Sequence, residues 1–372
     1  MKKSCRQYAV ILFLTLSCVV FSCTQNDPKP ASIQEAVDNI VSPYIVLGAD
    51  VGILVGTIQN GEKTIYSFGE REIGSKEKMT GQSVLEIASL TKTYTALALA
   101  DMHLKGDLNL DDPIENYLPN TVRIPSYNGK KITLRHLANH TSGFPRFASN
   151  ADKDVYNEYK GYTEQKMYDF ISNYTLQREP GTEFEYSAVG YGLLGQILSL
   201  KNNSNYEAMM MSNVLLPLNM MHTTISFTPD QLKNLVHGHN GNKSVESWSQ
   251  YMQNIVQGTG ALISTLDDQL IYLEANMGIT STPLYDAMKL SHELTFQHSG
   301  LYSDGIGLGW NLFTTEGKHI IWKNGANGGY NSFMGFDKET KTGVVILVNS
   351  SLNPEIFATD MGFEIVKALN RF

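Results

Sequence analysis

Apolar residues near the start of the folded chain recur at helical spacing. Ile33, Val37 and Ile40 lie on one side of a helix in which successive residues turn by about 100°. Ser32 and Glu35, three positions apart, form a capping-box pattern at the head of this stretch. The pattern predicts a helix that begins after Ser32.

Strand-like patterns occur at both ends of the chain. Residues 51–58 and 63–68 are separated by the turn residues Gln59-Asn60-Gly61-Glu62, which predicts a β-hairpin. From residue 111 to about 298 the pattern changes to helices and loops, and Asn353-Pro354 then predicts the start of a final helix. Four more short strands are expected before that helix, at residues 308–313, 319–323, 332–337 and 343–348.

A sheet built from both chain ends implies an α+β fold, because strands and helices are segregated along the sequence rather than alternating. We expect an antiparallel sheet flanked by helices, with a mostly helical lobe inserted. The α/β lobe would take residues 32–106 and 299–372, and the helical lobe residues 107–298. A cleft between two such lobes is the natural place for a functional site.

One strongly apolar stretch carries two reactive side chains at its head. Ser89-Leu90-Thr91-Lys92 opens a run that continues to Leu104, and Gly106 is a suitable C-terminal cap. Residues 96–100 are apolar on every helical face, so the helix should be buried. Residues three apart share a helix face, which lets the Lys92 amine reach the Ser89 oxygen. Burial or a neighbouring cation lowers the pKa of a lysine, and its neutral amine can then activate a serine nucleophile.

The first residues have the features of a secretory signal. A basic head precedes an apolar stretch at residues 8–21 that is too short to span a bilayer comfortably. Val20-Phe21-Ser22-Cys23 resembles a bacterial lipobox. We therefore expect residues 1–23 to be a lipoprotein signal peptide, Cys23 to carry the lipid, and residues 24–31 to form a tether. A plain signal peptide that contains cysteines is the alternative.

Composition limits the classes of partner. The 372 residues carry a formal net charge of −8, which argues against nucleic acid, because phosphate binding needs a basic surface. All three cysteines lie at or before residue 23, so the mature domain has neither disulfide nor thiol chemistry. The mature chain has no apolar run of about 18 residues, so we expect membrane contact through the lipid anchor only, on the cell envelope. The oligomeric state is left open.

Further segments, in a fixed order, resemble the serine β-lactamase and penicillin-binding-protein superfamily. The likeness is to the branch that holds class C β-lactamases, D-alanyl-D-alanine carboxypeptidases and related esterases, and it covers nearly all of the mature chain. It implies a β-lactamase/transpeptidase-like fold and an enzyme that uses no metal or organic cofactor. Besides Ser-x-x-Lys, the matching segments are residues 108–119 (LNLDDPIENYLP), 132–145 (ITLRHLANHTSGFP), 180–195 (PGTEFEYSAVGYGLLG), 217–220 (PLNM), 260–265 (GALIST) and 307–310 (GLGW).

The resemblance implies roles for individual catalytic residues. Ser89 matches the acylated nucleophile, and Lys92 matches the amine that activates it or relays its proton. Tyr186, in Tyr186-Ser187-Ala188, matches the tyrosine whose phenolic oxygen faces the nucleophile. A tyrosine near two cations can have a lowered pKa, which makes Tyr186 a candidate general base in acylation and acid toward the leaving group.

The resemblance also implies a substrate-binding strand. Lys323-Asn324-Gly325 matches the Lys-Thr-Gly or His-x-Gly element of an edge strand that lines the cleft. Lys323 would attract an anionic substrate group, and Gly325 would let the substrate backbone approach closely. The backbone N–H groups of Ser89 and Ala326 would form the oxyanion hole.

Two positions depart from the family pattern. The tyrosine motif usually ends in asparagine, which donates to a substrate carbonyl, but here Ala188 stands in its place. Its loss should weaken amide or lactam binding selectively, whereas esters are already activated. Asn324, where Thr or Ser is common, is a milder departure, because its side chain could still hydrogen-bond a carboxylate.

Other candidate residues have simpler interpretations. We expect structural roles for His136 and His140, and no metal site at His237 and His239, because the sequence offers no third ligand. Whether the aromatic residues Trp310, Tyr330 and Tyr302 line the cleft or pack the sheet is left open.

These observations favour a serine hydrolase that forms an acyl-enzyme with an ester or amide. The substrate would be a small molecule or peptide: a D-alanyl peptide, a β-lactam-like compound or a small ester. A carboxylesterase without peptidase or lactamase activity is the nearer alternative, and Ala188 favours it. A non-catalytic scaffold that has kept the fold is the more distant alternative. It is disfavoured because Ser89, Lys92, Tyr186 and Lys323 are all present.

Overall fold

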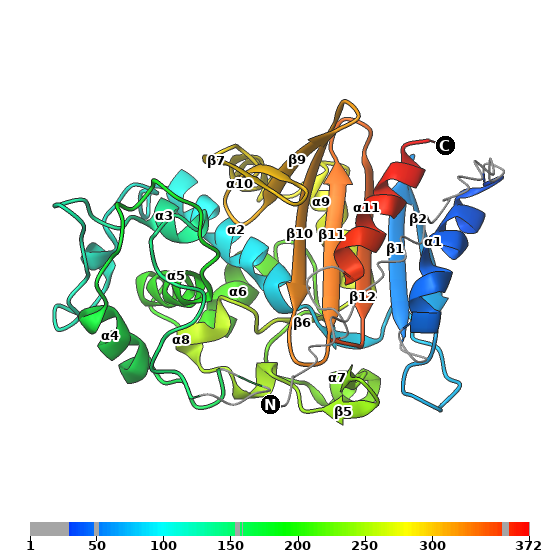
Figure 1. Cartoon of the computed structure of the whole chain (residues 1–372), viewed down its shortest axis with the longest axis horizontal. Coiled ribbons are helices and arrows are strands. Elements are labelled where there is room, and N and C mark those ends of the chain that lie inside the picture. The colour runs from blue at the N-terminus through cyan, green and yellow to red at the C-terminus, as the bar shows by residue number, and fades with distance from the viewer. Residues whose placement is uncertain (1–29, 48–51, 153–156, 158, 352–356, 372) are drawn as a thin grey trace, which may run out of the picture.

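An eight-stranded antiparallel sheet runs through one half of the molecule (Figure 1). The computed structural model describes residues 30–47, 52–152, 157, 159–351 and 357–371. The strand order is β2-β1-β12-β11-β10-β9-β8-β7. The sheet strands are β1 (Ile53–Gln59), β2 (Glu62–Phe68), β7 (Phe296–Gly300), β8 (Ser303–Ile306), β9 (Asn311–Thr315), β10 (Lys318–Ala326), β11 (Asn331–Asp337) and β12 (Thr342–Val348).

The two ends of the chain meet in the middle of this sheet. Strand β1 pairs with the C-terminal strand β12, with Ile53 opposite Val348 and Ile58 opposite Gly343. Strands β11 and β12 are buried along their whole length, which explains their almost continuous apolar sequences. The predicted β-hairpin is present as β1 and β2, and the prediction of a sheet built from both chain ends is confirmed.

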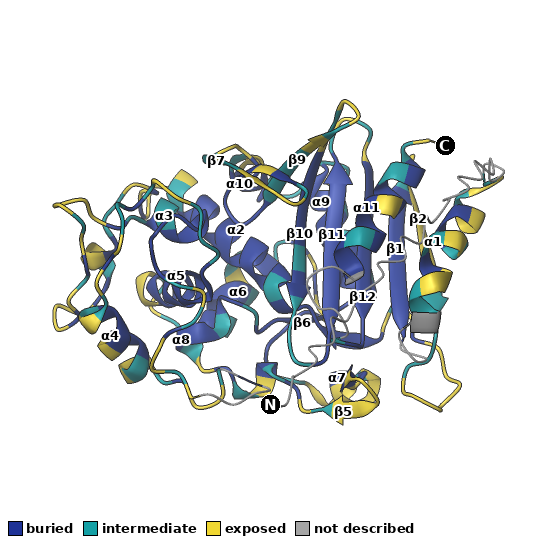
Figure 2. Cartoon of the chain, viewed as in Figure 1, coloured by how far each residue is buried: buried dark blue, intermediate teal, exposed yellow. Residues whose placement is uncertain are grey.

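Helices cover both faces of the sheet (Figures 1 and 2). On one face lie α1 (Ile33–Leu47) and α11 (Phe357–Leu369), which contact each other. Phe363 of α11 packs among Trp322 and Phe333 of the sheet, with ring centroids 5.3 and 5.5 Å away. The helix predicted after Ser32 is therefore present, and its apolar side is buried against this layer.

The opposite face is covered in part by α9 (Leu266–Asn276), which packs against β1 and β12. The leucine side chains of 266 and 270 fill the space in front of Gly56. The sequence places α9 within the helical lobe expected at residues 107–298, whereas the structure packs this helix against the sheet. The strand β6 (Ile263–Thr265) directly precedes α9 and pairs with β3 (Val84–Glu86) in a separate two-stranded sheet. This pairing fixes where α9 begins.

Most of the remaining helices form the other half of the molecule around α2 (Thr91–Leu104) (Figure 1). Helix α2 is buried on nearly every face, as its apolar sequence predicts, and ends next to Gly106 at φ +79°. The other elements are α3 (Leu134–Ala138), α4 (Glu164–Asn173), α5 (Ala188–Lys201), α6 (Tyr206–Met210), α7 (Pro229–Asn234), α8 (Asn254–Gln257), α10 (Tyr285–Ser291), β4 (Gly238–Asn240), β5 (Lys243–Val245), and the short turns η1 (Ala88–Leu90), η2 (Ile114–Tyr117), η3 (Met211–Leu215) and η4 (Ser249–Tyr251).

Several sequence-based predictions lie outside the described residues. These are the signal peptide at residues 1–23, Cys23, most of the tether at residues 24–31, and the helix start at Asn353-Pro354. Among the residues that the structure describes, none of the helices has both the length and the apolar character needed to cross a membrane.

Candidate active site

The turn before α2 places Ser89 at the edge of a cavity. Ala88, directly before it, has φ +47°, a left-handed conformation that costs free energy for any residue with a side chain. Such strain is tolerated only where the surroundings hold it in place, and here the turn is packed against β10 and β11. Ser89 is half-buried, and its hydroxyl faces the cavity.

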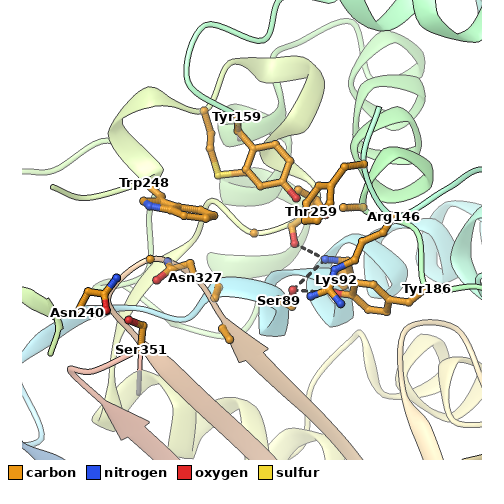
Figure 3. A pocket seen from close by; sticks show the side chains of 17 residues that line it. Ser89, Lys92, Arg146, Tyr159, Tyr186, Asn240, Trp248, Thr259, Asn327 and Ser351 are labelled. Carbon is orange, nitrogen blue, oxygen red and sulfur yellow. Dashed lines mark hydrogen bonds between the residues drawn. The ribbon is translucent and has the colours of Figure 1, made fainter. Parts of the chain in front are cut away.

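Lys92 lies directly behind Ser89 (Figure 3). Its Nζ is 3.0 Å from Ser89 Oγ and donates to the carbonyl oxygen of Thr259 at 2.6 Å. Lys92 is only 1% exposed. This burial, followed by the positive charges of Lys323 and Arg146, holds the pKa of Lys92 well below its usual value. A neutral amine at this position can accept the proton of the Ser89 hydroxyl.

Tyr186 approaches Ser89 from the other side. Its hydroxyl donates to Ser89 Oγ at 2.8 Å. The ring is held by His140, whose own ring lies 4.5 Å away and whose Nδ1 accepts the N–H of Ser187 at 3.0 Å. His140 is therefore structural, as expected, because it fixes the loop that carries Tyr186. Lys92 and Lys323 have their Nζ atoms 4.9 and 5.3 Å from the centroid of the Tyr186 ring, so the ring stands between two lysine amines.

Strand β10 reaches the nucleophile turn at Gly325. A Cβ at this position would lie 2.6 Å from the carbonyl oxygen of Ile87 and 2.8 Å from the backbone nitrogen of Ser89. Glycine is thus needed for the strand to pack against the turn, which is a different reason from the close substrate approach that we expected. Ala326 follows Gly325 and lines the cavity next to Ser89.

The side chains of Lys323 and Asn324 differ from expectation. Lys323 is buried, and its Nζ donates to the carbonyl oxygen of Asn324 at 2.7 Å. Burial, followed by the charge of Arg146, lowers the pKa of Lys323 to about 7. Among the described residues that line the two cavities beside Ser89, Lys323 is absent. Asn324 lines one cavity, but its Nδ2 donates to Thr359 Oγ1 at 3.0 Å rather than standing ready for a carboxylate.

Arg146 supplies a charge at the surface of the site that our sequence interpretation missed. It lines both cavities beside Ser89, of about 380 and 370 Å³, together with Tyr186 and Ala326. Its guanidinium carbon lies 5.4 Å from the centroid of the Tyr186 ring. The available signal was its position directly after the matching segment at residues 132–145.

The larger cavity has an aromatic and amide wall opposite Lys92 (Figure 3). Trp248, Tyr159 and Asn327 line it, and Ala188 occupies the position where the family pattern has asparagine. The backbone N–H of Ala188 donates to the carbonyl oxygen of Arg146 at 3.1 Å. The start of α5 and the arginine are therefore held together.

Most of the other candidate aromatic and histidine residues have structural positions. Trp310 and Tyr330 are buried and pack in the core, whereas Tyr302 lines the smaller cavity. His136 caps α3, because its Nδ1 accepts the N–H of Thr133 at 3.2 Å. His239 is buried with its Nδ1 3.2 Å from the carbonyl oxygen of Asn349. Within the described ranges, no three His, Cys, Asp or Glu side chains are grouped so that they could hold a metal ion.

Comparison with known protein families gives one match over most of the chain. The family described as Beta-lactamase matches residues 37–364. The D-alanyl-D-alanine-carboxypeptidase/endopeptidase AmpH of Escherichia coli K12 is 26% identical over 360 residues, which cover 92% of this chain and 91% of that protein. A β-lactamase of the same strain is also 26% identical, over 392 residues that cover 96% of this chain and 98% of that protein.

Solved structures show the same fold. A β-lactamase/D-alanine carboxypeptidase from Yersinia pestis, complexed with citrate, superimposes with a TM-score of 0.78 at 24% identity and covers 91% of this chain and 99% of that chain. A class C β-lactamase gives a TM-score of 0.78 at 21% identity, with 93% of this chain and 97% of that chain covered. The expected β-lactamase/transpeptidase-like fold is confirmed by these likenesses.

Proposed function

The chain belongs to the β-lactamase family and is a serine hydrolase that acts through an acyl-enzyme, and we propose that Ser89 is its nucleophile. The observation that carries this proposal is the pair of contacts at Ser89 Oγ, with Lys92 Nζ at 3.0 Å and the Tyr186 hydroxyl at 2.8 Å. One oxygen thus has a base and an acid within hydrogen-bond reach.

The order of proton transfers follows from the two partners. Neutral Lys92 takes the proton of Ser89 as Oγ attacks the carbonyl carbon of the substrate. The carbonyl oxygen becomes an oxyanion, which the backbone N–H groups of Ser89 and Ala326 stabilise. The leaving group departs with a proton from Tyr186 or Lys92, and water then releases the acyl group from Ser89.

We propose an ester or amide substrate that carries an anionic group near the bond that is cleaved. Arg146 places a permanent positive charge at the wall of both cavities, and a guanidinium is a side-chain group well suited to a carboxylate. The relatives named as a carboxypeptidase/endopeptidase and as a β-lactamase support a D-alanyl peptide or a β-lactam as candidates.

A carboxylesterase without lactamase or peptidase activity is the second candidate. Ala188 favours it, because the cavity lacks an asparagine amide at the position that would hold a substrate amide. Initial rates on a nitrophenyl ester, nitrocefin and a D-alanyl-D-alanine peptide separate the two. Turnover of the peptide far above that of the ester would exclude the esterase.

Labelling with a fluorophosphonate tests the nucleophile. We expect one adduct by intact-mass spectrometry, located on Ser89 by peptide mapping and absent from Ser89→Ala. Ser351→Ala is the matched control, because Ser351 lines the same cavity and should leave labelling unchanged. An adduct that persists in Ser89→Ala, or a wild-type protein that is never labelled, would overturn the proposal.

We also propose that the enzyme is anchored on the cell envelope by a lipid on Cys23, with residues 1–23 as its signal peptide and residues 24–31 as its tether. Processing that is blocked by globomycin, and lost in Cys23→Ala, supports this. Processing that is unaffected by either would contradict it.

A further inference from the structure

A buried carboxylate lies beside the nucleophile turn and takes no part in the proton transfers above. Glu86 is the last residue of β3, three positions before Ser89, and is 1% exposed. Its Oε1 accepts from the Ser247 hydroxyl and from the N–H of Ser249 at 3.2 Å. Its Oε2 accepts from Nδ2 of Asn327. One side chain thus ties β3 to two other segments, residues 247–249 and the segment at Asn327.

Both of these segments form part of the wall of the catalytic cavity, through Trp248 and Asn327. Asn327 directly follows Ala326, whose N–H is one proposed oxyanion donor. Its Oδ1 accepts from the N–H groups of Gly329 at 3.2 Å and Tyr330 at 3.1 Å, so the Asn327 side chain is held at both ends. On the other side, Trp248 lies between the two serines and packs against Gly328.

Placing a carboxylate here is unfavourable for stability by itself. Burial raises the pKa of Glu86 to about 7, while the hydrogen bonds from Ser247, Ser249 and Asn327 act in the opposite direction. Among the described residues, Glu86 has no ion-pair partner. Buried acidic groups without a counter-charge are costly, so a requirement other than stability is needed to explain this one.

A carboxylate differs from its neutral analogue in that both of its oxygens accept. Glu86 can therefore take a hydrogen bond from Ser247 on one oxygen and from Asn327 on the other. A glutamine offers one acceptor and one donor group. The Ser247 hydroxyl can accept from that donor, but the backbone N–H of Ser249 and Nδ2 of Asn327 can only donate, so one of these two would meet a donor. Because both oxygens of Glu86 accept, Asn327 must turn its Nδ2 toward Glu86 and its Oδ1 toward the N–H groups of Gly329 and Tyr330.

We propose that Glu86 is a positioning residue that holds the segment after Ala326 at a fixed distance from the Ser89 turn, and so keeps the two backbone donors of the oxyanion hole in register. It does so from β3, which is itself fixed by pairing with β6 through Glu86 and Ile263. The inference rests on the proposed roles of Ser89 and Ala326.

Glu86→Gln tests the inference with little change in shape. We expect the rate constant for acylation of Ser89 by an activated ester to fall about 10- to 100-fold, because displaced catalytic groups lose rate steeply. KM should change much less. Inhibition by a boronic acid, whose adduct on Ser89 mimics the tetrahedral intermediate, should weaken by a similar factor.

The double variant Glu86→Gln/Asn327→Asp separates positioning from general damage. The glutamine Nε2 can donate to the new aspartate, whose oxygens still accept from Gly329 and Tyr330. The hydrogen bonds that residue 86 makes with Ser247, Ser249 and residue 327 are therefore all restored. We expect this variant to recover acylation to within about threefold of wild type, since the remaining change is a relocated charge. Thermal unfolding of both variants identifies any loss of folded protein.

The outcomes are distinct. A wild-type protein that is never acylated would overturn both the proposed function and this inference. A wild type that is acylated, together with Glu86→Gln at an unchanged rate, would overturn the inference alone. It would equally be overturned if the folded double variant stayed as slow as Glu86→Gln.

Discussion

The two faces of the eight-stranded sheet use the same strands for opposite purposes. On the face covered by α1 and α11, Trp322 of β10 joins an apolar aromatic layer with Phe333 and Phe363. On the other face of the same strand, Gly325 lies against the turn that carries Ser89, where buried polar and charged groups collect. Apolar packing on one face stabilises the fold, and this stability offsets the cost of buried lysine and glutamate on the other.

The largest effect is expected at Lys92. Lys92→Ala should lower the acylation rate by about 10⁴-fold or more, because the amine that takes the proton of Ser89 is removed. Stability should be unchanged or higher, because a group with an unfavourable buried charged form is lost. Stopped-flow acylation and chemical denaturation measure the two quantities. If Lys92→Ala lost much unfolding free energy but kept its acylation rate, Lys92 would serve stability rather than catalysis, and the comparison of the two faces would be wrong.

The opposite face should give the opposite result. Phe363→Ala should cost about 3–5 kcal/mol of unfolding free energy, because a buried aromatic side chain is replaced by a cavity. The acylation rate per folded molecule should stay within about twofold of wild type, since Phe363 lies on the far side of the sheet from Ser89. Denaturation curves, with active-site titration to count folded enzyme, check this. A rate that falls in parallel with stability would contradict the comparison.

Arg146 should determine selectivity more than rate. Arg146→Gln should reduce kcat/KM for an ester with a carboxylate near the scissile bond about tenfold more than for a neutral ester of equal reactivity, because one charge-assisted contact is lost. Arg146→Lys keeps the charge and is the matched control. Equal losses on the two esters would refute carboxylate recognition by this side chain.

Ala188 should give the smallest effect. Ala188→Asn should raise the ratio of amide or lactam turnover to ester turnover about threefold, as expected for one added neutral hydrogen bond. Initial rates on nitrocefin and a nitrophenyl ester give the ratio. An unchanged ratio would show that this departure from the family pattern is neutral.

Local sequence patterns were sufficient for much of the fold. The β1–β2 hairpin, the buried helix α2 and the reach of Lys92 to Ser89 depend on residues close together in the chain, and all three are present. Helix α9 could not be placed in this way, because its apolar side suits a helical bundle and a sheet equally well.

The missed parts of the site depend on distant contacts. Glu86 and Asn327 are 241 positions apart, and neither belongs to a short motif that predicts the other. The burial of Lys323 was missed for a related reason. A motif gives the residue type on a strand, whereas the direction of a long side chain depends on neighbours such as Tyr186 that arrive from elsewhere in the chain.

The central claim is that a neutral Lys92 amine activates Ser89. It is tested most directly by the acylation rate of Ser89 as a function of pH. Because burial and two cations lower the pKa of Lys92, the rate should rise with pH and level off well below the usual lysine value of 10.5. Arg146→Gln removes one cation, so its midpoint should move to higher pH. A midpoint near 10.5 in the wild type, or a shift to lower pH in Arg146→Gln, would contradict the account.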